Sequence, residues 1–191
     1  SNATLMRQKH QSMNYSGLWG NRNFILILLC IISVISTKTF TLSTMTSHIT
    51  AVPGGDGMYG IAFLLINTGF IAVNLIFFFS FKVISKIMRR RTLLLLGMSL
   101  LIISITFYFH ITFLGIPEDI ALTLAFTFFI GFSSAIFYVP SLPELVSSAA
   151  LHTNIDPLFV NDTVSGIFSA SMLGSEVVGP FIGGLAIEEF G

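Results

Sequence analysis

The stretch GSEVVGPFIGG, residues 174–184, lies in an apolar run near the end of the chain. It combines a carboxylate, a proline and several residues with little or no side chain. In a helix surrounded by water, each glycine costs about 1 kcal/mol and a proline about 3 kcal/mol relative to alanine. The stretch is therefore a poor helix for a soluble protein, so the solvent of the chain has to be established first.

The composition indicates that this solvent is a lipid bilayer. Of the 191 residues, 53% are hydrophobic and only 9% are charged, and the mean hydropathy is +0.87. Soluble domains carry about 25% charged residues. A helix that crosses a membrane needs about 20 predominantly apolar residues, and such segments recur down the chain. We predict an all-α membrane protein with about five transmembrane helices, near residues 23–47, 58–83, 92–114, 120–139 and 163–187.

The charged residues give the predicted orientation. All nine lysine and arginine residues precede Thr92, and only Lys38 lies deep within a predicted span. Because cytoplasmic loops are enriched in basic residues, residues 1–22 and the loop between the second and third spans are predicted to face the cytoplasm. The transmembrane domain then covers residues 23–191. The formal net charge of zero argues against a partner that is a nucleic acid.

Local signals mark two helix starts. Residues 117–119, with the sequence Pro-Glu-Asp, precede the fourth span, and Asn161 and Asp162 precede the fifth. We expect prolines to break the interval between these two spans and to leave room for one short helix near residues 142–151. These prolines are Pro140, Pro143 and Pro157.

The fifth span carries a stripe of small residues. Ser175, Gly179 and Gly183 are four positions apart and share one face of a helix, a pattern that lets two helix backbones approach closely in lipid. Pro180 removes a backbone hydrogen bond and favours a bend, which neighbouring helices can tolerate. The stretch 174–184 therefore predicts a tight contact between a bent helix and its neighbour.

Two motifs resemble those of a known family. The spacing of the small residues resembles the G-x(8)-G-x(3)-G-P-x(2)-G-G signature of antiporters in the major facilitator superfamily. The matching residues are Gly166, Ser175, Gly179, Pro180, Gly183 and Gly184. The segment VISKIMRRRTLLLLG, residues 83–97, is similar to the basic cytoplasmic loop of that superfamily, with Ser85 at the position of the usual acid. Its basic residues are Lys86, Arg89, Arg90 and Arg91.

The resemblance carries expectations about fold and activity. Transporters of this superfamily consist of two six-helix halves that hold the substrate between them near the membrane midplane. The interval before the last span resembles the connection between the tenth and eleventh helices of vesicular amine transporter-like members. The chain is then a fragment, a partial six-helix half of a major facilitator fold. The resemblance implies exchange of protons for an organic cation, a polyamine or a monoamine, by alternating access, with the remaining half of the transporter and the lipid bilayer as partners.

Two charges lie at membrane depth, where they are expensive and therefore candidates for function. Lys38 stands among serine and threonine residues, which suggests a wall that faces water, although its long stem could also reach toward an interface. Glu176 lies at the edge of the small-residue stripe and has three interpretations. It carries the coupled proton, attracts a cationic substrate, or pairs with a basic residue such as Lys38.

Three further residues are candidates for the substrate and proton pathway. Asn67 and Asn74 are seven positions apart on one face of the second span, where they line a substrate path or hydrogen-bond to other helices. Tyr138 could contact an ammonium group through the face of its ring, or it packs among the neighbouring phenylalanines.

The sequence offers no signal for an enzyme. The four histidines show no metal-ligand spacing, and no glycine-rich phosphate loop or cysteine pair is present. We predict a protein without catalytic residues, metal or cofactor. Two alternatives to an amine transporter stay open: another proton-coupled antiporter of drugs or metabolites, and a truncated membrane protein that does not transport but assembles with other membrane proteins. Vesicle and plasma membranes both fit.

Overall fold

The structure is a computed structural model that describes residues 18–110, 115, 117–150 and 157–190. This part of the chain contains five long helices and no strand. All five are long and apolar enough to cross a bilayer. The prediction of an all-α, multi-pass membrane protein with five spans is thus confirmed. The helices are α3 (Arg22–Ala51), α4 (Tyr59–Ile87), α5 (Arg90–Tyr108), α6 (Ile120–Ala150) and α7 (Pro157–Phe190).

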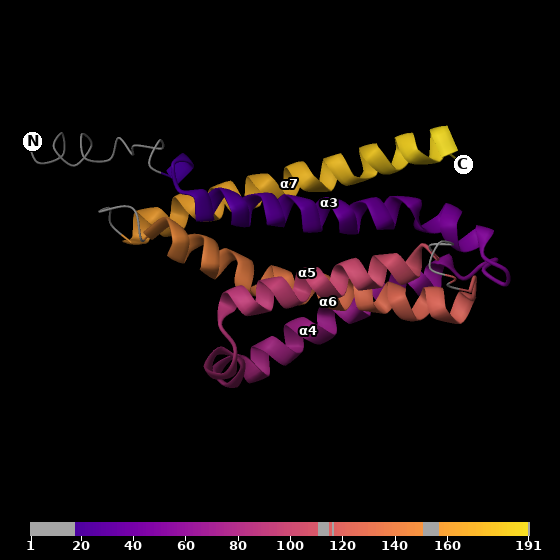
Figure 1. Ribbon diagram of the computed structural model, residues 1–191, viewed down its shortest axis with the longest axis horizontal. Coiled ribbons are helices and arrows are strands. Elements are labelled where there is room, and N and C mark those ends of the chain that lie inside the picture. The colour runs from indigo at the N-terminus through magenta and orange to yellow at the C-terminus, as the bar shows by residue number, and fades with distance from the viewer. Residues whose placement is uncertain (1–17, 111–114, 116, 151–156, 191) are drawn as a thin grey trace, which may run out of the picture.

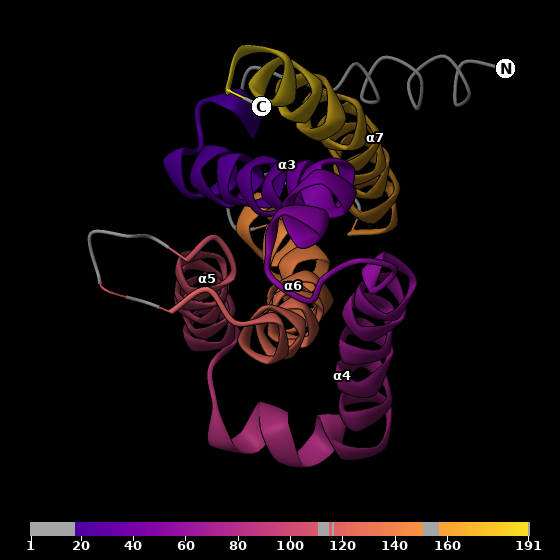
Figure 2. The same cartoon turned by 90° about the vertical axis from the view of Figure 1, so that its right-hand side faces the viewer.

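The helices form two layers. Helices α3 and α7 lie side by side in one layer, and α5, α6 and α4 form the other (Figures 1 and 2). Figure 2 shows α6 between α5 and α4, beneath α3, and α6 contacts each of the other four helices. Half of the most apolar window of α6 is buried, 50% against 17% for α7. The lower layer is therefore organised around α6, while α7 leaves most of its surface open.

The contact between α3 and α7 depends on the small-residue stripe. A side chain at Gly179 would overlap the Thr39 hydroxyl and the backbone of Ser36, and one at Gly183 would overlap Ser43. Ser175 is 1% exposed at the same contact. The hydrophobic effect does not drive helices together in lipid, so their association depends on van der Waals packing. Small residues strengthen this packing because they let the two backbones approach closely.

The contact between α4 and α6 is built in the same way. A side chain at Gly131 of α6 would overlap the backbone carbonyl of Ile66, and one at Gly69 of α4 would overlap the carbonyl of Phe128. Glycines on both helices therefore allow the two backbones to pack in direct contact. The sequence motif of the fifth span does not include these glycines, so the structure adds a second close contact of the same kind.

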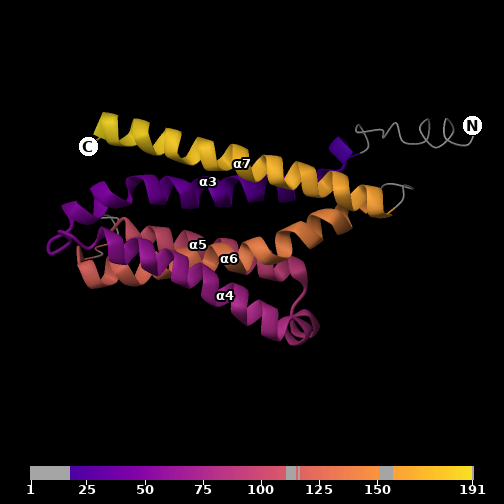
Figure 3. The same ribbon diagram turned by 180° about the vertical axis from the view of Figure 1, so that it is seen from behind.

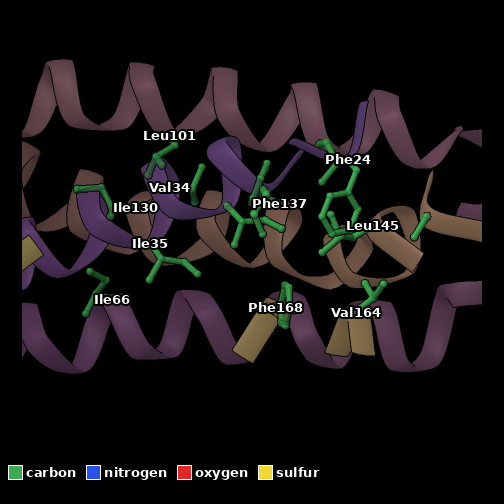
Figure 4. Packing of buried hydrophobic residues seen from close by; sticks show 14 of the residues in the cluster. Phe24, Val34, Ile35, Ile66, Leu101, Ile130, Phe137, Leu145, Val164 and Phe168 are labelled. Atoms are coloured by element: carbon green, nitrogen blue, oxygen red, sulfur yellow. The ribbon is translucent and has the colours of Figure 1, made fainter. Parts of the chain in front are cut away.

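A single large cluster of buried apolar side chains connects the layers. Figure 4 shows Phe137 of α6 among Val34, Ile35 and Leu145, and Phe137 is 2% exposed. The cluster takes residues from every helix. Members labelled in Figure 4 are Phe24, Val34, Ile35, Ile66, Leu101, Ile130, Phe137, Leu145, Val164 and Phe168.

The predicted break at Pro140 and Pro143 is wrong. Helix α6 continues through both prolines to Ala150, and there is no separate short helix at 142–151 in the described residues. A proline removes a backbone hydrogen bond, but hydroxyl side chains and neighbouring helices can satisfy the freed groups in a membrane helix. The Ser141 hydroxyl, which lies between the two prolines, donates to the Tyr138 carbonyl at 2.6 Å, whereas the carbonyls that lose an N–H partner to the prolines are those of Ile136 and Val139. Instead of ending, α6 bends in its second half (Figure 3).

The two predicted helix starts have different outcomes. Asp119 caps α6, because its Oδ1 accepts from the backbone N–H of Ala121 at 2.9 Å. Asn161 and Asp162 were expected just before the fifth span, but they lie inside α7, which begins at Pro157. Proline suits this first position because its missing N–H would be unpaired there in any case.

Helix α5 ends earlier than the sequence predicts. Its last residue is Tyr108, and His110 follows with φ 43, in the left-handed region where a helix commonly terminates. The expected end of the third span near residue 114 lies outside the described residues. A histidine in this conformation is uncommon but tolerated, since the left-handed region is several-fold enriched in asparagine, aspartate and histidine among residues other than glycine.

Candidate functional site

A cavity of about 280 Å³ lies between four of the helices. Helix α3 contributes Lys38, α4 contributes Phe70, α6 contributes Tyr138 and α7 contributes Glu176. Most of the remaining lining residues are aliphatic or aromatic. The cavity therefore brings together three of the five predicted pathway residues, and both charges that the sequence placed at membrane depth line it.

Lys38 is held over an aromatic ring. Its Nζ lies 4.2 Å from the centroid of Phe70, within the distance at which the negative face of a ring attracts an ammonium group. Lys38 stands near the middle of α3, about 20 Å from either helix end at 1.5 Å of rise per residue. The Phe70 ring is the contact that the structure gives this ammonium group.

The aromatic contact of Lys38 continues into a row of rings. The ring centroids of Phe70 and Tyr138 are 5.9 Å apart, and those of Tyr138 and Phe168 are 5.7 Å apart. These rings come from α4, α6 and α7, so the row joins both layers of the bundle. Two of the three residues, Phe70 and Tyr138, also line the cavity.

Glu176 shares the cavity with Lys38 but does not form an ion pair with it. In the described part of the chain, the one ion pair within 4.0 Å joins Arg91 to Glu144. Glu176 is also the exposed neighbour of buried Ser175, so its carboxylate lies at the rim of the α3–α7 contact. The cavity thus holds one positive and one negative group that do not form an ion pair with each other.

The α3–α7 contact fixes the spacing of these two charges. The hydroxyl groups of Ser36 and Thr39 both lie within hydrogen-bond distance of the Ser175 carbonyl oxygen, at 3.4 and 3.3 Å. Thr39 follows Lys38 in the sequence, and Ser175 precedes Glu176. The same few residues that seat the helices therefore position the charged side chains.

The remaining pathway candidates lie elsewhere. The amide of Asn67 donates to the Phe63 carbonyl at 2.7 Å, and that of Asn74 donates to the Phe70 carbonyl at 2.8 Å. Both acceptors belong to α4 itself, four residues earlier, and neither asparagine lines the cavity. The structure thus shows each amide bonded within its own helix and outside this cavity.

The packing motif divides into residues with and without a neighbour. Gly179, Gly183 and Ser175 meet α3, as described above, and Pro180 lies within α7. A side chain added at Gly166 or at Gly184 would meet no atom within 4 Å. Contact with α3 therefore accounts for only some of the small residues of the motif. Gly166 and Gly184 have space around them for a side chain.

The basic loop reaches a partner that the sequence reasoning missed. Arg91 donates from Nε to the Glu144 carboxylate at 2.7 Å, and Arg90 donates to the Pro143 carbonyl at 3.5 Å. The Glu144 side chain is 10% exposed, and a buried carboxylate requires such a partner. The sequence does contain a signal for this partner, because Glu144 is a single acidic residue in an apolar segment that contains prolines. Lys86 lies exposed in the last turn of α4, and Arg89 is the residue before α5.

Two histidines that looked scattered in the sequence meet at the opposite end of the bundle. The rings of His48 and His110 have centroids 5.8 Å apart. His48 Nε2 lies 2.7 Å from the Tyr108 carbonyl, so this nitrogen carries a hydrogen. His110 Nε2 lies 3.1 Å from the Thr123 hydroxyl. No spacing rule could have paired these residues, because the contact depends on the left-handed turn after α5.

The five spans define the class of this protein: an all-α, multi-pass membrane protein, with a cavity between four of its helices. Among the residues that the structure describes, no group of three or more histidine, cysteine, aspartate or glutamate side chains could hold a metal ion. No protein-family model, no curated protein and no solved structure matches the chain.

Proposed function

We propose that the chain is part of a proton-coupled antiporter of organic cations or amines. The observation that carries this proposal is the cavity, in which Glu176, a carboxylate without an ion-pair partner among the described residues, and the aromatic residues Phe70 and Tyr138 line one space. Ionisable groups in membrane spans commonly mark the path of a substrate or an ion. A carboxylate together with aromatic faces is the chemistry that recognises an ammonium group.

The lining of the cavity favours an organic cation over a hydrated inorganic one. Hydrated metal ions prefer a cage of oxygen ligands, whereas this cavity is mainly aliphatic and aromatic. Its volume of about 280 Å³ is close to the lower limit of small-molecule pockets, about 300 Å³. A compact amine with an apolar body therefore suits the site better than an extended molecule.

The arrangement of helices is compatible with one wall of an alternating-access transporter. The resemblance of residues 83–97 and of the packing motif to major facilitator antiporters supports this assignment, as does the exposed position of Glu176. In such a transporter the path across the membrane lies between two halves; this chain would supply the cation cavity, and the other half would complete the path. We therefore expect these five helices alone to bind a cation but not to move it across a bilayer.

Uptake into proteoliposomes tests the proposal. The complete transporter, this chain together with its other half, is reconstituted and given an imposed pH gradient, and the uptake of a labelled monoamine and a labelled polyamine is measured. We expect uptake to follow the gradient and to fall at least tenfold in Glu176→Gln. The matched control is Glu188→Gln, which changes an exposed acid of the same helix outside the cavity.

Two results would contradict the proposal. If no cation enters under any gradient, the chain does not belong to an amine antiporter. If Glu176→Gln and Glu188→Gln transport equally well, the cavity is not the site that binds the cation.

A further inference from the structure

Lys38 occupies the place that a cationic ligand would take. Its ammonium group lies 4.2 Å from the centroid of Phe70, and Phe70 is the ring of the aromatic row that is contributed by α4. An ammonium ligand that used this ring face would have to displace Lys38, because one face of a phenylalanine accommodates one cation at contact distance. The site therefore contains its own competitor, attached to α3.

We propose that Lys38 is the group that exchanges its proton for the cargo: the Lys38 ammonium and the cationic cargo occupy the Phe70 face in alternation. This inference rests on the proposed function, because it assigns the coupled proton within the same cation site. It differs from the interpretation in which the carboxylate of Glu176 carries the proton.

The charge balance of the cavity is the argument for this exchange. The titratable side chains that line the cavity are Lys38 on α3, Tyr138 on α6 and Glu176 on α7, and α4 contributes none. One carboxylate can neutralise one cation. A cargo cation together with a charged Lys38 would leave an excess positive charge among apolar side chains, which is strongly unfavourable.

Loss of one proton from Lys38 removes this excess. When the cargo enters, one N–H bond of the Lys38 ammonium breaks and the proton passes to water at the mouth of the cavity, which leaves a neutral amine. When the cargo leaves, the amine binds a proton and returns to Phe70. In this scheme the Glu176 carboxylate takes no part in the proton exchange, so the net charge of the cavity is the same in both states, and one proton is exchanged for one monovalent cation.

The two residues therefore have separable roles. Glu176 sets the affinity for any cation, whereas Lys38 makes that affinity depend on pH. A proton that competes with a ligand for one site weakens ligand binding up to tenfold for each unit by which the pH falls. This dependence belongs to Lys38 and disappears when the lysine is replaced.

Binding of tetraethylammonium to the chain in lipid nanodiscs tests the proposal. This probe carries a permanent charge, so any effect of pH on its dissociation constant belongs to the protein. Calorimetric titrations at pH 6, 7, 8 and 9 are expected to show a rise in affinity with pH of up to tenfold per unit. Lys38→Met is expected to bind at least tenfold more tightly than the unmodified chain at pH 6, with the same affinity at every pH.

Two further variants keep the test independent of folding. Lys38→Arg retains a positive charge that is not lost in this pH range, so we expect weak binding that does not change with pH. Glu176→Gln in the Lys38→Met background is expected to weaken binding at least tenfold at every pH, whereas Glu188→Gln leaves it unchanged. Only exchange of the lysine proton gives these results together.

The outcomes distinguish this inference from the proposed function. If the unmodified chain and Lys38→Met bind the probe with equal affinity and equal pH dependence, the inference is overturned while the cation site stands. If Lys38→Arg shows the same rise with pH as the unmodified chain, the inference is also overturned. If neither the unmodified chain nor Lys38→Met binds the probe, the cation site fails, and the proposed function and this inference fail with it.

Discussion

The bundle contains two constellations of acid and base that differ in whether the partners meet. At one end, Arg91 and Glu144 form an ion pair at 2.7 Å that joins α5 to α6. Farther along the bundle, Lys38 and Glu176 line one cavity, yet the lysine contacts a phenylalanine ring instead of the carboxylate. The first pair connects two helices directly, while the second leaves both charges available to a ligand.

The difference lies in what holds the helices together at each place. Helices α3 and α7 already meet through glycines and serine, so the α3–α7 contact does not need a bond between Lys38 and Glu176. The start of α5 carries arginines where a helix dipole disfavours positive charge, and the Glu144 carboxylate offsets this charge. Because small residues hold α3 and α7 together, the charged residues of the cavity are not needed to stabilise this contact.

The largest expected effect is that of Arg91→Met. The variant leaves the Glu144 carboxylate, 10% exposed, without its cation, and an uncompensated buried charge is costly. We expect the free energy of unfolding to fall by about 2 to 3 kcal/mol, less than for a fully buried pair because Arg91 itself is largely exposed. Denaturant titration in detergent micelles, followed by circular dichroism, measures this loss.

Arg90→Met is the matched control for Arg91→Met. Arg90 lies next in the chain, is exposed and reaches only the Pro143 carbonyl at 3.5 Å, so the expected change is below about 0.5 kcal/mol. Equal losses in the two variants would mean that the ion pair does not hold α5 to α6, and the contrast between the two constellations would disappear.

The second expected effect tests whether glycines, and not charged residues, hold α7 against α3. In Gly179→Ala the new methyl group overlaps Thr39 and the α3 backbone, so the helices must separate. We expect a loss of about 1 to 3 kcal/mol, typical of an overpacked contact. Thermal unfolding in micelles measures it.

Gly184→Ala provides the control, since an added methyl group there meets no atom within 4 Å. It is expected to be neutral or to stabilise α7 by up to about 1 kcal/mol, because alanine favours a helix over glycine. If both substitutions destabilise the chain to the same degree, the close contact at Gly179 is not what holds α7 against α3.

The sequence could predict the elements more readily than their contacts. Composition and segment length gave the five spans, because a bilayer imposes a minimum length of apolar helix on any chain. The spacing of Ser175, Gly179 and Gly183 gave one contact, because a four-residue period is a local property of a helix. The glycines at 69 and 131 carry no such pattern, since each belongs to a different helix and they meet only through the fold.

The errors have local physical causes. Pro140 and Pro143 were read by the rule for helices in water, where a freed carbonyl has to find solvent, whereas α6 continues through both because neighbouring groups can satisfy it. The partner of Arg91 lies 53 residues away, and such a pairing depends on the arrangement of α5 against α6. Lys38 and Glu176 were predicted as candidates, with a pair between them as one interpretation, but their common cavity requires four helices to be in place.

A smaller loss is expected for Glu144→Gln than for Arg91→Met. The glutamine removes the charge of the buried partner and leaves Arg91, whose side chain is 62% exposed, to be solvated by water. We expect a loss of about 1 kcal/mol, close to that of one hydrogen bond. If Glu144→Gln destabilised the chain more than Arg91→Met in the same denaturant titration, the buried carboxylate would not be the group that needs its partner.

The smallest expected effect on stability is that of Lys38→Met, although it removes a charge at membrane depth. The variant loses the contact with the Phe70 ring, worth about 0.5 to 1 kcal/mol at a partly exposed site, but it also ends the cost of holding an ammonium group among apolar side chains. Because these two terms oppose each other, we expect the free energy of unfolding to change by less than about 0.5 kcal/mol. The same denaturant titration compares Lys38→Met with Arg91→Met. A loss as large as that of Arg91→Met would mean that Lys38 stabilises the fold and cannot give up its place on the Phe70 ring to a ligand.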